Sequence, residues 1–268
     1  PIKSSAASDV YKRQTNGLPI HQDGNTVFKG DKVFKDEMTD RDPRLAANID
    51  LEGVRLNGIA GAVYGIGGYF GTRFVNEDLF NTAAGQSNTN TTDAPIMKLN
   101  EVLLNYLEAA AELNDMGAYT LSQKDLDITI NEIRKRASVN MPAVTLSGKN
   151  FSVNGVIIND PDRDLGNSEV VGDYEVSPIL WEVRRERRIE LATEGQRYFD
   201  VRRWMIADQD GEGRQFGYVH GMNMNAAEDK FYEEVEASPI VFRRKMYLYP
   251  IPDDEMKKTE LLVQNPGW

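Results

Sequence analysis

The sequence predicts a mainly α protein, in which a helical scaffold carries long irregular loops and a few short strands. Two observations favour this fold class. Apolar residues recur at helical spacing after Pro95, and a charge-rich segment with helix start and stop signals follows Ser177. Elsewhere the chain is rich in Gly, Asn, Asp and Thr, which is typical of turns and loops.

The first long helix is predicted to begin at Pro95 and to end near Leu113. Residues three and four positions apart lie on the same side of a helix, and this segment has such a series. The apolar face consists of Ile96, Leu99, Leu103, Tyr106, Leu107, Ala110 and Leu113. We therefore expect this face to pack against the core.

A second helix is predicted to follow and to form an antiparallel hairpin with the first. Ser122 and Asp125 resemble a capping box, with Asp in place of the usual Glu. Leu121 and Leu126 have the spacing of a hydrophobic staple around that cap. The helical pattern continues to about Ser138.

The remaining segments divide into loops and short elements. Residues 15–94 are read as a loop-rich segment with short strands, and Met141–Tyr174 as a turn-rich excursion that carries a hairpin at Phe151–Ile158. Ile240–Tyr249 alternates enough to predict a strand, and Asp253–Lys258 predicts a last short helix.

The segment from Trp181 to Trp204 is half charged, yet it is not patterned as an ordinary solvated helix. Ser177-Pro178 is a good start signal, Gly195 is a stop signal, and Gln196–Met205 predicts a second short helix. Four glutamates at i,i+4 spacing form one row along the predicted helix: Glu182, Glu186, Glu190 and Glu194. Like charges at this spacing repel each other. We expect these glutamates and the nearby arginines to pair with neighbouring elements as a structural ion-pair network.

Four groups of residues resemble motifs of the SusD/RagB family. The family signature is matched by Glu186-Arg187-Arg188, Glu190-Leu191, Glu194-Gly195, Arg197, Asp200 and Arg203-Trp204. Further matches are Asp42-Pro43-Arg44-Leu45, Leu99–Tyr106 with Glu108-Ala109, Tyr249-Pro250-Ile251-Pro252 and Gln264–Trp268. The chain departs from the family at Asn100, where alanine is usual, and at Lys98, where arginine is frequent.

The resemblance implies a TPR-like helical scaffold, with residues 95–268 as the SusD/RagB-like C-terminal region. It implies a non-enzymatic, surface-exposed lipoprotein of the outer membrane, without a cofactor. Such a protein captures oligosaccharides and delivers them to a SusC-like TonB-dependent transporter. Two alternatives stay open: a RagB-like peptide-binding uptake protein, and a helical-repeat scaffold that binds only a protein partner.

The first residues are predicted to be foreign to the protein. Ser4–Gln14 resembles the in-frame translation of a transposon-based sequencing adapter, so we expect residues 1–14 not to be native. Because family members are about twice as long, the chain is interpreted as a C-terminal half. The lipid anchor is then expected in the missing N-terminal part.

Composition restricts the class of ligand. The formal net charge of −11 argues against nucleic acid, whose affinity depends on neutralising phosphates with Lys and Arg. It also argues against electrostatic adhesion to anionic lipid. The chain has no cysteine, which excludes disulfides and thiolate metal sites.

Three aromatic residues, Tyr64, Tyr69 and Phe70, are the candidate ligand-binding residues. They flank a glycine-rich turn in the part of the chain where the family has ligand-binding loops, and an aromatic ring can stack on a sugar. The alternative is that these rings pack the loop onto the helices. A nucleotide-binding loop is rejected because Phe70 stands where G-x-G-x-x-G requires its third glycine.

Asp160, Asp162 and Asp164 have the alternate spacing of a calcium-binding loop. An EF-hand is excluded because the glycine comes one position late, at Gly166, and Val171 stands where the closing glutamate is required. A solvated acidic turn and a looser calcium site remain as interpretations.

The sequence contains no recognisable catalytic motif. The two histidines, His21 and His220, have no neighbouring nucleophile motif, and neither H-E-x-x-H, G-x-S-x-G nor a P-loop occurs. Trp181 and Trp204 are expected to pack in the core rather than to stack on sugar.

Overall fold

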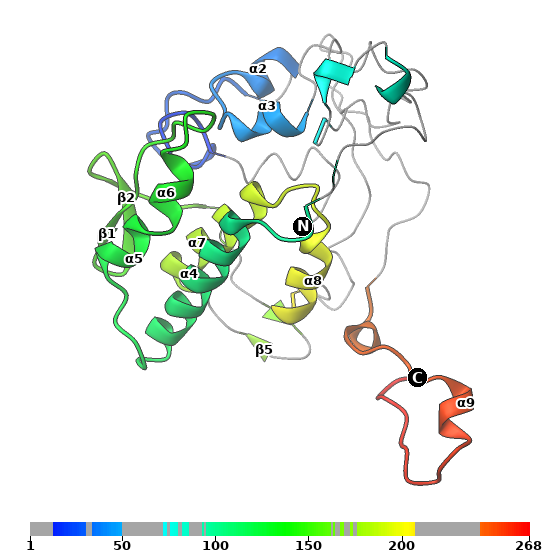
Figure 1. The fold of residues 1–268 in the computed structure, drawn as a ribbon. Helices are drawn as coiled ribbons and strands as arrows, with labels where there is room; N and C mark the ends of the chain where they lie inside the picture. Colours follow the sequence, from blue (N-terminus) through cyan, green and yellow to red (C-terminus); the bar gives the residue numbers. More distant parts are fainter. Residues whose placement is uncertain are drawn as a thin grey trace.

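The computed structural model describes residues 13–30, 34–49, 72–73, 76–79, 82–85, 93, 95–161, 163, 167–168, 172–173, 176–206 and 242–268. In these residues helices dominate, which confirms the mainly α prediction (Figure 1). The helices are α2 (Phe34–Met38), α3 (Arg44–Asn48), η1 (Glu77–Leu79), η2 (Ala83–Gly85), α4 (Leu99–Asp115), α5 (Gln123–Asp127), α6 (Ile130–Arg134), α7 (Pro178–Glu190), α8 (Gln196–Arg203), η4 (Arg244–Tyr247) and α9 (Asp253–Met256). The strands are β1 (Thr145–Ser147), β2 (Asn150–Val153), β3 (Val156–Ile157), β4 (Asn167–Ser168) and β5 (Gly172–Asp173).

Helices α4 and α7 pack side by side at the centre of the helical region (Figure 1). A start signal fixes the beginning of α7, because the Ser177 hydroxyl accepts a hydrogen bond from the backbone N–H of Leu180 at 3.1 Å, with Pro178 in the first turn. The main core cluster joins these helices to α5, α6 and the small sheet. It contains Leu107, Ala110, Ala111, Leu121, Leu126, Ile130, Val144, Phe151, Val153, Ile158, Val176, Ile179, Leu180, Trp181 and Val183.

The buried face of α4 differs from the predicted one. The helix begins at Leu99 rather than Pro95, and Ile96 is fully exposed. The prediction was also wrong for Leu99, Tyr106 and Leu113, which are exposed, and Leu103 is only partly buried. The helix instead buries Glu101 and Glu108 together with leucine and alanine. An apolar pattern does not reveal a face whose buried positions include carboxylates with polar partners, here Arg203 for Glu108 and Gln196 for Glu101.

The second predicted helix is interrupted at Thr129, so α5 and α6 are separate. The Thr129 hydroxyl donates to the carbonyl of Asp125 at 2.5 Å, and the Thr129 N–H turns to the carbonyl of Leu126. A side chain that takes the i−4 carbonyl in this way competes with the helical hydrogen bond. The predicted capping residues are confirmed, since Asp125 accepts hydrogen bonds from the N–H and hydroxyl of Ser122 at 2.8 and 2.7 Å.

The predicted hairpin at Phe151–Ile158 is confirmed, and one further strand extends it. Strands β1, β2 and β3 pair antiparallel in that order. Asn154 and Gly155 both have positive φ, which is the requirement of the tight turn that joins β2 to β3. The hairpin inserts Phe151 into the main core cluster.

The C-terminal region confirms one prediction and corrects another. The short helix α9 occurs where it was expected, and Figure 1 shows it apart from the helical region that contains α4 and α7. The strand predicted at Ile240–Tyr249 is wrong for its described part, because residues 244–247 form the 3-10 helix η4. Phe242 and Tyr247 pack against Val201 of α8 and against Trp204 and Ile206 just after it, so tertiary contacts override the alternating pattern.

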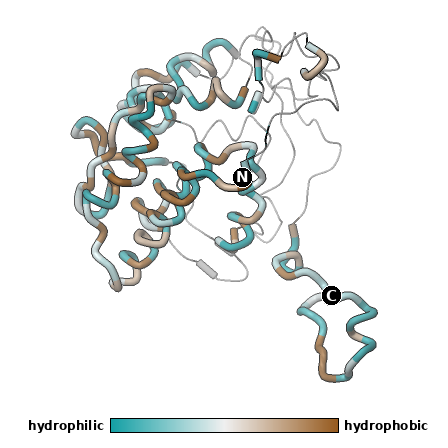
Figure 2. Tube along the Cα trace, in the orientation of Figure 1, coloured by the Kyte–Doolittle hydropathy of each residue, from teal (hydrophilic) through white to brown (hydrophobic). Residues whose placement is uncertain are grey.

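Polar and apolar residues are interspersed along the helical region (Figure 2). None of the helices that the structure describes is long and apolar enough to cross a membrane.

Arg13 and Gln14, the last two residues of the segment predicted to be foreign, are fully buried. Arg13 makes an ion pair with Glu182 through Nη2, whereas its Nε and Nη1 have no hydrogen-bond acceptor in the described part of the chain. Burial, together with the neighbouring Arg185 and Arg134, lowers the pKa of Arg13 well below its usual value. The folded state therefore disfavours the charged form of this side chain.

Replacing Arg13 with Met is expected to raise the free energy of unfolding by about 1–3 kcal/mol, because an apolar side chain removes buried donors without partners. Glu182 keeps Arg185 as a cationic partner at 3.5 Å. Chemical denaturation of both proteins measures the difference. A lower stability of the variant would show instead that the ion pair with Glu182 outweighs the cost of burial.

Candidate functional site

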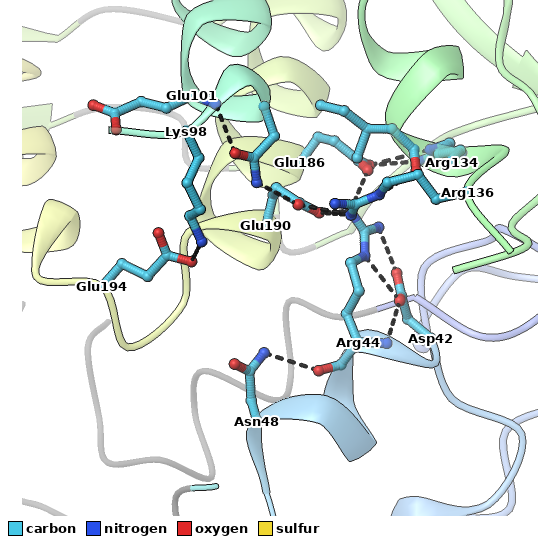
Figure 3. Close-up of polar contacts among 12 residues, drawn as sticks. Asp42, Arg44, Asn48, Lys98, Glu101, Arg134, Arg136, Glu186, Glu190 and Glu194 are labelled. Atoms are coloured by element: carbon cyan, nitrogen blue, oxygen red, sulfur yellow. Dashed lines mark hydrogen bonds and ion pairs between the residues drawn. The ribbon is translucent and has the colours of Figure 1, made fainter. Parts of the chain in front are cut away.

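Four glutamates, on α7 and just after it, form a row that pairs with cations from several elements, and Figure 3 shows three of them, Glu186, Glu190 and Glu194. Glu186, near the middle, accepts hydrogen bonds from Arg44 of α3 and Arg134 of α6, each at 2.7 Å. All three side chains are at most 5% exposed. Two helices distant in sequence are thereby bound to one carboxylate of α7.

The next glutamate of the row, Glu190, binds three partners. Arg136 donates through Nη2 to both carboxylate oxygens at 2.7 and 2.8 Å, and Arg44 donates to Oε2 at 3.0 Å. The side-chain amide of Asn100 donates to Oε1 at 2.5 Å. The departure from the family's alanine at position 100 thus supplies a hydrogen-bond donor to a buried carboxylate.

The ends of the row are also paired. Glu194 makes ion pairs with Arg73 and Lys98, and Glu182 with Arg13 and Arg185. The predicted structural ion-pair network is therefore present, and its cations come from outside the charged segment as well as from within it. Neutralisation by these cations removes the repulsion expected along an i,i+4 row.

Arg44 is held in position by Asp42 of the same short motif. The carboxylate accepts from Nε at 3.0 Å and from Nη2 at 2.6 Å, while Nη1 points to Glu186 and Glu190. Burial would raise the pKa of Asp42, but Arg44 lowers it below its usual value. Figure 3 shows Arg44 between these carboxylates, so that one guanidinium links α3 to α7.

The electrostatics of Glu186 follow from the same contacts. Burial by itself raises its pKa, but the positive charges and hydrogen bonds of Arg134 and Arg44 overcome this and hold the pKa far below the ordinary value of 4.5. The carboxylate is therefore ionised throughout the neutral range and is unsuited to act as a general acid there.

The other side of α7 connects to α8 and α4. Arg187 donates to both oxygens of Asp200 at 3.0 Å, and Arg203 binds Glu108 of α4 at 2.7 and 2.6 Å. Trp204 donates from its indole nitrogen to Glu108 at 2.6 Å and is buried. Trp181 is buried as well, which confirms that both tryptophans are packing residues.

A cavity of about 710 Å³ opens beside this network, between α3, α4 and α6. Its wall combines apolar side chains with charged and amide groups. The lining residues are Arg44, Ala47, Arg73, Lys98, Leu99, Asn100, Leu103, Ile128, Glu132, Ile133, Arg136, Ser138, Val139 and Glu190. A volume in the range of small-molecule sites and a wall with a few convergent polar groups are features of a ligand-binding pocket.

The sequence did not predict this cavity. Two of its lining residues, Arg44 and Glu190, belong to the family motifs, whereas Arg73, Arg136 and Glu132 were not singled out. The glutamate row of α7 did indicate that cations from other elements must pack against it, because glutamates at i,i+4 spacing repel each other unless they are neutralised. The sequence alone does not indicate which cations arrive.

The candidate ligand residues Tyr64, Tyr69 and Phe70 lie outside the described residues, as do Asp162 and Asp164. Asp160 is described, and it accepts a hydrogen bond from the indole of Trp181 at 3.0 Å and lies 3.7 Å from Arg185. These contacts bind it to α7. In the part of the chain that the structure describes, no group of three or more His, Cys, Asp or Glu residues could hold a metal ion.

Comparisons with known proteins agree with the motifs. A family model described as the SusD family matches residues 5–268. The chain belongs to the SusD family. No curated protein matches it.

Solved structures similar to this SusD-family chain have the same fold. One, a SusD-like carbohydrate binding protein from Bacteroides fragilis NCTC 9343, is 26% identical with a TM-score of 0.58, and the match covers 94% of this chain and 46% of that one. Another, BT4246, is 22% identical with a TM-score of 0.65 over 98% of this chain and 45% of that one. The chain thus spans less than half the length of these proteins.

Replacing Glu186 with Gln in this SusD-family chain is expected to lower the free energy of unfolding by about 3 kcal/mol, because Arg44 and Arg134 lose a buried counter-charge. Urea denaturation measures the change. The matched control is Glu132→Gln, an exposed glutamate on α6, for which we expect a change below about 1 kcal/mol. Equal effects of the two substitutions would contradict the assigned role of Glu186.

The free energy of unfolding should depend on pH less strongly in Glu186→Gln than in the wild-type protein. A carboxylate whose folded-state pKa lies below its unfolded value stabilises the fold fully above the unfolded value, and this contribution is lost as the pH falls toward the folded-state pKa. For Glu186 the loss begins below about 4.5. The wild-type protein should therefore lose more stability than Glu186→Gln between neutral pH and pH of about 3.

Proposed function

We propose that this chain is part of a surface lipoprotein of the outer membrane that binds oligosaccharides and delivers them to a SusC-like TonB-dependent transporter. The observation that carries the proposal is the family match over residues 5–268. A similar solved structure is described as a SusD-like carbohydrate binding protein, which supports glycan as the ligand class.

The cavity supplies a place where a sugar would fit. Its apolar side, formed by Leu99, Leu103 and Ile133, would face the C–H groups of a pyranose ring. On the other side, the guanidinium of Arg136 and the amide of Asn100 would reach sugar hydroxyls, which act as both donors and acceptors. Binding of this kind requires no covalent step.

The proposed role of the ion-pair network is to hold the cations of the cavity in fixed positions. Paired with buried carboxylates, the cavity cations are fixed before a ligand arrives, so binding loses less side-chain entropy than it would with mobile groups. The network thereby connects the stability of the scaffold to the shape of the cavity.

Isothermal titration of the intact protein against a panel of oligosaccharides tests the ligand class. We expect saturable binding of at least one glycan. Binding of oligopeptides without binding of any glycan would replace the proposal with a RagB-like peptide receptor. Binding of neither would favour a scaffold that recognises only a protein partner.

Delivery to a transporter is tested separately, by purification of the tagged intact protein from its native membranes under mild detergent. We expect a TonB-dependent outer-membrane protein to copurify in stoichiometric amount. Recovery of the intact protein in the outer-membrane fraction without such a partner would contradict the transport role and leave glycan binding standing.

A further inference from the structure

At the cavity, the side chains of the cations are more exposed to solvent than the carboxylates that bind them. Arg136 is 43% exposed, Lys98 26% and Arg73 21%. The carboxylates that bind these cations lie deeper, with Glu190 only 3% exposed and Glu194 10%. Although the charges of the network largely balance, the groups that a ligand would meet first are mainly cationic.

Arg136 has hydrogen-bonding capacity left over. Its Nε donates to the carbonyl of Ile133 at 3.0 Å and its Nη2 to Glu190, while Nη1 has no acceptor within the described ranges. A guanidinium carries five N–H donors in a fixed plane, which suits a carboxylate better than a single hydroxyl. The half-exposed side chain therefore presents donors toward the cavity that it lines.

We propose that this cavity binds the carboxylate of an acidic glycan, such as one that contains a uronic acid. This inference rests on the proposed glycan-binding function and adds the charge of the sugar. Arg136 donates to the ligand carboxylate, and Lys98 and Arg73 add positive charge beside it. The apolar side formed by Leu99, Leu103 and Ile133 contacts the ring.

The net charge of −11 does not oppose this assignment. At physiological ionic strength charges are screened over about 8 Å, so the groups lining the cavity decide the interaction and the distant acidic surface contributes little. Fixed cations also lose little entropy when the ligand carboxylate arrives, since buried Glu190 and Glu194 already hold them.

One cavity residue opposes an anionic ligand. Glu132 of α6 lines the cavity, is 44% exposed and makes an ion pair with the exposed Lys135 at 2.5 Å. Because its negative charge lines the same cavity as Arg136, it lowers the attraction for the carboxylate of a ligand. Removal of that charge and removal of Arg136 therefore have opposite expected effects on an acidic ligand.

The test is isothermal titration of the intact protein with two matched probes, oligogalacturonate and a neutral galactose oligosaccharide of the same length. We expect tighter binding of oligogalacturonate. Arg136→Gln should weaken that binding about tenfold or more, whereas Glu132→Gln should strengthen it a few-fold. Lys124→Gln, which removes an exposed lysine of α5 outside the cavity, should leave it unchanged. Thermal unfolding of each variant confirms that it is folded.

The possible outcomes separate the two proposals. Preferential binding of the neutral probe overturns the acidic assignment and leaves glycan binding intact. Binding of acidic peptides alone, or of no glycan in a broad panel, overturns both. If oligogalacturonate binds but Arg136→Gln and Glu132→Gln do not differ in affinity, the carboxylate is bound elsewhere and the cavity assignment is wrong.

Discussion

The structure depends on the neutralisation of one row of carboxylates on α7. Four glutamates at i,i+4 spacing would destabilise an isolated helix. Here Arg44 of α3, Arg134 of α6 and Arg136 just after α6 bind the buried carboxylates of Glu186 and Glu190. Each of these two carboxylates is shared by two arginines, so the elements that carry the arginines are held in a fixed arrangement around α7.

The same ion pairs connect the fold to its proposed function. Glu190, a buried residue of the cavity wall, binds Arg136, and Glu194 binds Arg73 and Lys98, so that these cations are held at the cavity surface. A ligand would therefore meet groups whose positions the scaffold has already fixed. The charged segment identifies the family through its sequence, and through its contacts it also shapes the candidate site.

Sequence patterns predicted what depends on local chemistry. The Ser177 cap, the Ser122–Asp125 cap and the hairpin at β2–β3 each rest on a few adjacent residues, and each is present. The buried face of α4 and the break at Thr129 were not predicted. On α4 the buried Glu108 is paired with Arg203, which only the tertiary structure supplies, whereas at Thr129 a buried hydroxyl takes the carbonyl of Asp125 within the same helical segment.

The cavity was beyond the reach of the sequence for a related reason. Arg73, Lys98 and Arg136 are far apart in the chain, and nothing local to any of them indicates that they converge. The assignment of Tyr64, Tyr69 and Phe70 as ligand-binding residues stays a prediction.

A double-mutant cycle between Arg44 and Glu186, measured by chemical denaturation, tests most directly whether the α7 ion pairs organise this fold. We expect a coupling energy of about 1.5–3 kcal/mol between Arg44→Gln and Glu186→Gln, and additive effects of the two substitutions would contradict the account.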